Sequence, residues 1–429
     1  MRTLKHISKL LMVTLLMVSC ENGQKKKASS EQLTQKAVTA KDILGNKDYV
    51  AISYGGYRAK TRDIQPTIAE LKEDMKILHA MGIRVLRTYN VQLPHAANLL
   101  KAIRELKNED NDFEMYVMLG AWIDCKYAWT GQTPDHNQES EQNEGEIERA
   151  VALANQYPDI IKIIAVGNEA MVKWATSYYV QPDVILKWVN HLQQLKKDGK
   201  LDKDLWITSS DNFASWGGGD SLYHVEDLNK LIKAVDYISM HTYPMHDTHY
   251  NPVFWGTVDD GKRSSLEKID YAMQKAKEYA ISQYDSVYKY MKSLGVDKPI
   301  HIGETGWASY SNGHYGDTGS KATDEYKEAL YYHSIRDWTE KNNISCFYFE
   351  AFDEIWKDAR NPGGSENHFG LFTIDGKAKY ALWDLVDKGV FKGLTRNGNP
   401  IVKTYKGNKD SLLIEVQLPP VKAKLVVDH

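Results

Sequence analysis

The spacing of apolar runs along this chain constrains its fold more than any other feature. Eight short runs recur from residue 49 onward, and turn-forming or polar residues separate them: YVAISY (49–54), IRVLRTY (83–89), EMYVMLGAW (114–122), IKIIAVGN (161–168), LWITSS (205–210), VDYISMHTY (235–243), PIHIG (299–303) and SCFYFEAF (345–352). Most are nearly continuous in Val, Ile, Leu and Tyr. This pattern is typical of parallel strands that are covered on both faces.

Helical patterns fill the gaps between these runs. Apolar residues follow the helical period over 68–78, with Thr67 and Glu70 at capping-box spacing, and Pro182 precedes a second stripe over 185–195. Strands that alternate with helices form βαβ units, and eight of them close a (β/α)8 TIM barrel. A doubly wound open sheet is the alternative, but SYGGYR (53–58) lacks the G-x-G-x-x-G spacing of its phosphate loop. We predict an α/β chain with the barrel over residues 47–388.

The pattern changes in residues 389–429. SLLIEVQL (411–418) is a lone strand candidate between polar segments. We therefore expect a small C-terminal β extension that packs on the barrel.

The N-terminal segment indicates export. Residues 1–19 hold basic residues and an apolar run (10–18) that is too short to span a bilayer, which indicates a signal peptide. The run ends MVSC, which is similar to a bacterial lipobox and implies acylation of Cys20; an ordinary signal with an incidental cysteine is the alternative. Residues 20–46 are polar and predict a flexible tether. We expect a lipid-anchored protein of the cell envelope, held to the bilayer of a Gram-negative bacterium at its outer membrane or surface.

Charge and cysteine usage exclude several classes of partner. A formal net charge of -3 offers no basis for binding nucleic acid. Cys125 and Cys346 lack paired spacing, so we expect two buried thiols rather than disulfides or zinc ligands. His246 and His249 follow His241 in a stretch between prolines that indicates a loop, whereas paired zinc ligands more often share one helix. We expect no metal and no cofactor.

Two glutamates stand at the ends of predicted strands. Glu169 follows the run 161–168 and Glu304 follows the run 299–303. In a closed barrel the carboxyl ends of the strands share one mouth, so both side chains can face one cleft. Two carboxylates across a cleft are what glycoside hydrolysis needs. An ion pair or a helix cap is the alternative for each glutamate taken alone.

The residues around these glutamates resemble a known family. VGNEA (166–170) and IGETGW (302–307) resemble the two catalytic motifs of glycoside hydrolase family 17. The members of this family are β-1,3-glucanases with a (β/α)8 barrel, and they retain the anomeric configuration. The resemblance implies that Glu169 is the acid/base and Glu304 the nucleophile. It further implies substrate-binding roles for one pair of residues in each of three other motifs: Arg87 and Tyr89 (LRTYN), His241 and Tyr243 (HTYP), and Glu354 and Lys357 (FEAFDEIWK). His241 departs from the family, which commonly has Asn there.

Other side chains near the strand ends are candidate substrate contacts. They are Tyr54, Trp122, Asn168 and Trp307. An indole face can stack on a pyranose ring, and an amide can hold a substrate hydroxyl. Core packing is the alternative for the indoles. We also expect Tyr243 to donate to Glu304 and to keep that carboxylate ionised.

The two glutamates predict a glycosidase, which we expect to be monomeric, and the resemblance implies that it cleaves laminarin-type β-1,3-glucan with retention of anomeric configuration. Its partners are then the glucan and, through Cys20, the bilayer. Two alternatives remain open. One is a β-1,3-glucan glucosyltransferase, which shares the covalent glycosyl-enzyme. The other is a catalytically silent surface protein that binds glycans.

Overall fold

The computed structural model describes residues 37–257 and 261–422. The predicted signal peptide (1–19), Cys20 and the first part of the predicted tether lie outside the described residues.

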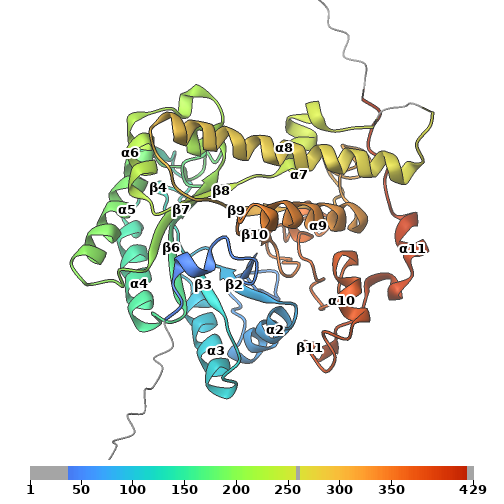
Figure 1. The fold of residues 1–429 in the computed structure, drawn as a ribbon, viewed down its shortest axis with the longest axis horizontal. Coiled ribbons are helices and arrows are strands. Elements are labelled where there is room, and N and C mark those ends of the chain that lie inside the picture. The colour runs from blue at the N-terminus through green and yellow to red at the C-terminus, as the bar shows by residue number, and fades with distance from the viewer. Residues whose placement is uncertain (1–36, 258–260, 423–429) are drawn as a thin grey trace, which may run out of the picture. The chain divides into compact units, whose positions relative to one another are not determined.

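Eight parallel strands close into a barrel in the order β1-β2-β3-β6-β7-β8-β9-β10 (Figure 1). Each strand begins within one of the eight predicted runs, and β7 and β9 continue past the ends of theirs, so the predicted barrel is confirmed. Their bounds are β1 (Val50–Ser53), β2 (Ile83–Arg87), β3 (Tyr116–Ala121), β6 (Ile161–Asn168), β7 (Trp206–Asn212), β8 (Ile238–His241), β9 (Ile300–Gly306) and β10 (Cys346–Phe349).

Helices follow the strands and surround the barrel (Figure 1). The longer ones are α2 (Ile68–Ala80), α3 (His95–Glu109), α4 (Gln142–Gln156), α5 (Pro182–Lys197), α6 (Glu226–Ala234), α7 (Pro244–Tyr250), α8 (Ser265–Ser293) and α9 (Glu325–Lys341). Short turns η1 (Ala214–Gly218), η2 (Ser221–Tyr223), η3 (Pro252–Phe254), η4 (Ser365–Asn367) and η5 (Tyr380–Leu382) lie in the connections. The predicted capping box opens α2, because the Thr67 hydroxyl accepts from the Glu70 N–H while the Glu70 carboxylate accepts from the Thr67 N–H.

Side chains alternate between two apolar layers along each strand. In β3, Val117 and Leu119 pack outward against the helices, whereas Tyr116 and Met118 belong to a second cluster with Ile163 and other strand residues. This alternation follows from the two-residue period of a strand. The outer layer joins the helices to the barrel, and the second cluster fills part of its interior, which also holds buried polar side chains such as Ser210 and Ser239.

Helix α1 (Ala40–Ile43) joins this second cluster. Ala40 and Ile43 are fully buried, and Thr39 and Asp42 form a capping box at the start of the helix. The predicted flexible tether therefore does not extend through these residues, because their apolar side chains find a packing site among strand residues such as Ala51 and Val85.

The C-terminal segment corrects one secondary-structure prediction. A small antiparallel pair is present, formed by β11 (Thr395–Arg396) and β12 (Asn399–Pro400), and α10 (Trp383–Asp387) and η6 (Thr404–Gly407) flank it. The predicted strand 411–418 is wrong, because α11 (Lys409–Ile414) occupies this stretch. A strand that buried Leu412 would also bury Ile414, two residues on, yet Ile414 is 81% exposed. The Asn408 side chain caps the helix by accepting from the Ser411 N–H.

Candidate active site

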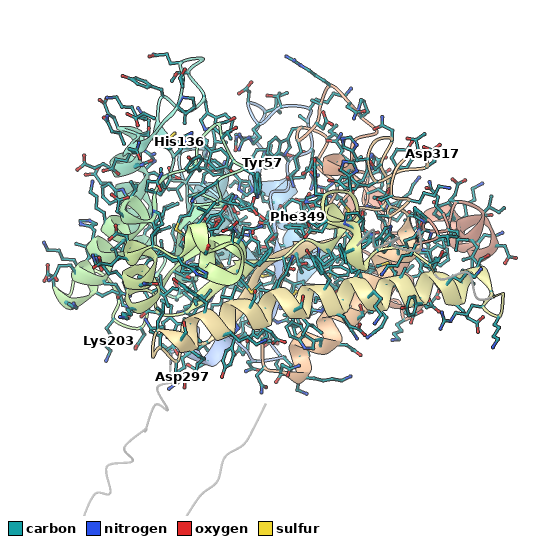
Figure 2. All side chains as sticks on the ribbon, turned by 90° about the horizontal axis from the view of Figure 1, so that it is seen from above. Tyr57, His136, Lys203, Asp297, Asp317 and Phe349 are labelled. Carbon is teal, nitrogen blue, oxygen red and sulfur yellow. The ribbon has the colours of Figure 1, made fainter. Side chains whose placement is uncertain are left out.

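A cleft of about 1000 Å³ opens at the carboxyl ends of the barrel strands. Its lining includes residues that follow β1, β3, β6 and β10, and Glu304 of β9. Figure 2 shows the two ends of the barrel, with Tyr57 and His136 near one end and Lys203 and Asp297, which precede β7 and β9, near the other. Functional side chains thus gather where a (β/α)8 barrel places them.

Glu304 lies on β9 and is held by three donors. The Arg87 guanidinium and the Tyr89 hydroxyl both donate to its Oε2, the latter at 2.9 Å, and the Tyr243 hydroxyl donates to its Oε1 at 2.6 Å. Burial favours the neutral acid, but Arg87, the two phenols and, while it is protonated at low pH, the His241 imidazolium outweigh burial and lower the pKa of Glu304 to about 2. Glu304 is therefore an ionised carboxylate at neutral pH.

Glu169 directly follows β6, where the backbone makes an unusual turn. Gly167 has φ +80° and Glu169 itself has φ +46°, a left-handed value that a glutamate rarely adopts, and the Glu169 N–H donates to the Ser210 carbonyl at 3.0 Å. The carboxyl Oε1 lies 3.1 Å from His241 Nδ1. Burial and the negative charge of Glu304 raise the pKa of Glu169 to about 8. Glu169 therefore carries a proton at neutral pH.

Arg87, His241 and Tyr243 were predicted to contact substrate, but their side chains contact the carboxyl groups of Glu304 and Glu169. Arg87 is 1% exposed, and besides Glu304 it contacts the Gly303 carbonyl and, at 2.5 Å, the Asn168 Oδ1. His241 is fully buried between Glu169 and Ser210. Neither residue lines the cleft, and neither does Tyr243, which donates to Glu304 as predicted. Asn168 and Tyr89 do line the cleft.

The prediction that Trp307 contacts substrate is wrong. Its indole is fully buried, donates from Nε1 to the Ala322 carbonyl at 2.8 Å, and packs against the rings of Trp255 and Tyr331. Strand alternation explains this placement. Glu304 faces the barrel interior, the Thr305 hydroxyl meets Tyr331 of α9, and Trp307 lies on the same outer side as Thr305.

An aromatic series forms one wall of the cleft. Trp122 lines the cleft as predicted, its ring centroid lies 5.2 Å from that of Tyr178, and Tyr178 stacks on Trp129 at 5.3 Å. Trp129 belongs to the hairpin of β4 (Cys125–Lys126) and β5 (Asp135–Glu139) and is 64% exposed. Sequence reasoning missed Tyr178 and Trp129; the aromatic-rich KYAWTG (126–131) after the third run was the available signal.

The opposite wall carries Glu354 and Lys357 beside the rings of Phe349 and Trp356. Glu354 accepts from the Tyr57 N–H at 2.9 Å and from the Trp356 indole at 3.1 Å. Lys357 donates to Glu350 at 2.6 Å and lies 3.4 Å from Glu354. Burial raises the pKa of Glu350 well above its usual range, although Lys357 opposes this. Glu350 was missed, although it stands in the FEAFDE motif.

The remaining predicted residues have structural partners. Tyr54 borders the cleft, but its hydroxyl donates to Asp74 Oδ2 at 3.0 Å and is not free for substrate. His246 and His249 lie on helix α7 rather than in a loop, because Pro244 opens a helical turn there. His246 lies 3.6 Å from Glu366, a cleft residue that was not predicted.

Other sequence expectations concern metals, thiols and membranes. Within residues 37–257 and 261–422, no group of three or more His, Cys, Asp or Glu side chains could hold a metal ion. Cys125 and Cys346 are free and buried, as predicted. In the same part of the chain, no helix has both the length and the apolar character that crossing a membrane requires.

Comparisons with known proteins agree with this geometry. The family profile described as "BtgE/BtgC glycoside hydrolase domain" matches residues 51–370. A glucan 1,3-beta-glucosidase of Arthroderma benhamiae is 23% identical over 321 residues, which cover 73% of this chain and 83% of that protein. The glucan endo-1,3-beta-glucosidase A of Solanum lycopersicum is 25% identical over 54% of this chain and 69% of its own length.

A solved structure is much more similar. An endo-laminarinase from Formosa Hel1_33_131 is 74% identical, with a TM-score of 0.90 over 91% of this chain and all of that chain. A β-1,3-glucanosyltransferase from Rhizomucor miehei, 21% identical with a TM-score of 0.53 over 78% of this chain and 97% of its own, shares the fold. This protein is a glycosidase, and it belongs to the BtgE/BtgC glycoside hydrolase domain family.

Proposed function

We propose that this glycosidase hydrolyses laminarin-type β-1,3-glucan with retention of anomeric configuration, and that Glu304 is its nucleophile and Glu169 its acid/base. One observation carries the assignment. Two neighbouring carboxyl groups stand in opposite protonation states at neutral pH, since the pKa of Glu304 is about 2 and that of Glu169 about 8. Retaining glycosidases need one ionised and one protonated carboxyl group in the first step.

The reaction follows from these states. A Glu304 oxygen attacks the anomeric carbon while Glu169 gives its proton to the departing glycosidic oxygen, so one C–O bond forms as the other breaks. Formation of the ester removes the charge of Glu304, which was one of the causes of the raised Glu169 pKa. Glu169, now ionised, takes a proton from water, whose oxygen attacks the anomeric carbon and releases Glu304 as a carboxylate.

The donors around Glu304 limit its freedom to move. Arg87, Tyr89 and Tyr243 fix both carboxylate oxygens, and hydrogen bonds of this kind hold a reacting group in place without reorganisation during the reaction. The substrate class is supported by the endo-laminarinase that is 74% identical to this chain over 91% of its length. An aromatic wall from Trp122 to Trp129 offers flat apolar faces for successive glucose rings.

Product analysis with laminarin tests this proposal. We expect glucose or short oligosaccharides, with the β-anomer as the first product in time-resolved NMR. Longer chains as the main product would instead identify a glucosyltransferase, and bound glucan that is not degraded would identify a glycan-binding protein.

Chemical rescue tests the role of Glu169. Glu169→Ala should accumulate the glycosyl-enzyme with an activated aryl β-glucoside, because this leaving group needs little protonation whereas the second step lacks its base. Azide needs no deprotonation and should restore turnover, giving the β-glycosyl azide. An α-azide would exclude retention.

We further propose that the protein is a monomeric lipoprotein of the cell envelope, acylated at Cys20. The MVSC sequence and the polar segment after it support this proposal. Cys20→Ser should abolish incorporation of labelled palmitate and move the protein from the membrane to the soluble fraction of a Gram-negative host. Light scattering of a soluble form without the signal peptide should give the mass of one chain, slightly below the 48.9 kDa of the full sequence. Palmitate incorporation in the Cys20→Ser variant would contradict the anchor.

A further inference from the structure

A buried chain of hydrogen bonds ends on Glu169, and the reaction above does not use it. His241 Nδ1 lies 3.1 Å from Glu169 Oε1, and its Nε2 lies 2.8 Å from the Ser210 hydroxyl. Ser210 in turn lies 2.9 Å from the Ser239 hydroxyl. The imidazole therefore connects Glu169, the proposed proton donor, to two serines on the neighbouring strands β7 and β8.

The residues that form this chain of hydrogen bonds are buried inside the barrel. Ser210, Ser239 and His241 are all 0% exposed. Gly303 on β9 leaves the space that the serines occupy, since a Cβ atom there would lie 2.1 Å from the Ser239 hydroxyl and 2.5 Å from that of Ser210. A side chain at position 303 would displace both hydroxyls.

His241 is neutral in this environment. The groups that face it are Glu169 beyond the end of β6, Asp211 on β7, Glu304 on β9 and Arg87 on β2. Burial lowers the pKa of His241 to about 4; Glu304 and Asp211 favour the imidazolium, and Arg87 opposes it. A neutral imidazole has one N–H, so only one of its two contacts can be a donation from the ring.

The two tautomers have opposite consequences for Glu169. With the proton on Nε2, the ring accepts the acidic proton of Glu169 and draws it away from the cleft. Its lone pair then faces a carboxylate once Glu169 has ionised. With the proton on Nδ1, the ring donates to Oε1 in both states, and the acidic proton stays on Oε2. Glu169 passes through both states in each turnover, so only the second tautomer keeps the contact throughout.

We propose that His241 is a positioning residue for Glu169: its Nδ1–H donates to Oε1, the Ser210 hydroxyl donates to Nε2, and the acidic hydrogen is thereby directed to the glycosidic oxygen. This inference rests on the proposed function for its effect on catalysis. The direction of the hydrogen bonds in the free protein is independent of it.

Two amide variants separate the contacts of the ring. The amide nitrogen of His241→Asn falls near Nδ1 and keeps a donor for Glu169, whereas that of His241→Gln falls near Nε2 and keeps only the Ser210 contact. On laminarin we expect kcat of the Gln variant to be at least about tenfold below that of the Asn variant, with a smaller difference in KM. Loss of a donor to the carboxylate should also move the alkaline limb of kcat/KM upward by about one pH unit in the Gln variant.

Each other outcome overturns the proposal. A downward shift of the alkaline limb in His241→Gln would show that Glu169 donates to the ring. Equal losses of kcat in both variants without a shift would show that His241 only supports the fold. His301→Gln is the matched control, because His301 is also buried on a barrel strand but accepts from the Ser345 N–H, away from the site. The His301→Gln variant should have a lower melting temperature, but the acid and alkaline limbs of its kcat/KM profile should stay where they are in the wild type.

A spectroscopic measurement needs no activity. Imidazole ¹⁵N shifts in protein with labelled histidine report the tautomer, and the resonances lost in His241→Asn assign the ring. We expect the Nδ1–H form; the Nε2–H form would refute the inference. If the wild-type protein leaves laminarin intact, the proposed function fails while this test of the tautomer still stands.

Discussion

Tyr243→Phe should raise the acid limit of activity. Its hydroxyl donates to Glu304 Oε1 at 2.6 Å, and a hydrogen bond to a charged group contributes about 1.5–3 kcal/mol. One pKa unit corresponds to about 1.36 kcal/mol, so losing this donor should raise the pKa of Glu304 by about 1–2 units. From its value of about 2 it would reach about 3–4.

The direction of this pKa shift follows from the ionised form of Glu304. The donor stabilises the carboxylate, so its loss favours the neutral acid, and a neutral Glu304 cannot attack. Activity then disappears at a higher pH as the solution is acidified. The alkaline limit reports Glu169, whose raised pKa depends on burial and on a Glu304 charge that is still present near pH 8, so it should not move.

The measurement is kcat/KM for laminarin between about pH 2.5 and 9, with circular dichroism at each pH to confirm that the variant stays folded. Tyr89→Phe offers a comparison, because this phenol donates to the other oxygen at 2.9 Å. An acid limb that moves by less than about 0.3 unit, or an alkaline limb that moves instead, would refute the assignment of Tyr243 as a donor that keeps Glu304 ionised.

Three further changes probe other parts of the molecule. Glu304→Gln should abolish turnover but keep glucan binding, and activity within about tenfold of wild type, or about 1.4 kcal/mol of barrier, would remove Glu304 from the nucleophile role. Trp129→Ala should raise KM for long laminarin oligosaccharides roughly tenfold, since losing about 50 Å² of apolar contact costs about 1.3 kcal/mol, while laminaribiose should be cleaved as before; equal effects on both would contradict a distant binding platform. Arg396→Ala should lower the free energy of unfolding in urea by about 3–5 kcal/mol, because it leaves the buried Asp74 carboxylate with fewer donors. Lys341→Ala, which breaks an exposed pair with Asp337, should cost less than about 1 kcal/mol and serves as its control.

The order of strands and the positions of Glu169 and Glu304 at strand ends could be predicted from local signals. Apolar runs of strand length identify the barrel, and the same runs place Glu169 and Glu304 at their carboxyl ends. Closure of the sheet then brings together residues far apart in the chain. The capping box of Thr67 and Glu70 could be predicted for a related reason, since the two residues lie only three positions apart in the sequence.

The direction of individual side chains could not be predicted in the same way. Trp307 directly follows the GETG stretch, yet it packs against α9, because strand alternation turns it away from the cleft. Ile414 belongs to an apolar run that resembles a strand. The segment is helical, however, and the Ile414 side chain is exposed to solvent instead of being buried on the same face as Leu412.

Electrostatic roles depend even more on the assembled barrel. Arg87 and His241 come from β2 and β8. They meet the carboxyl groups of Glu304 and Glu169 only because closure of the barrel brings four strand ends together. Local patterns thus encode which residues form strands and where the carboxylates stand, since hydrophobic period and capping act over a few residues. The protonation states of Glu169 and Glu304 arise from burial and from charges supplied by other strands, and these exist only once the chain is folded.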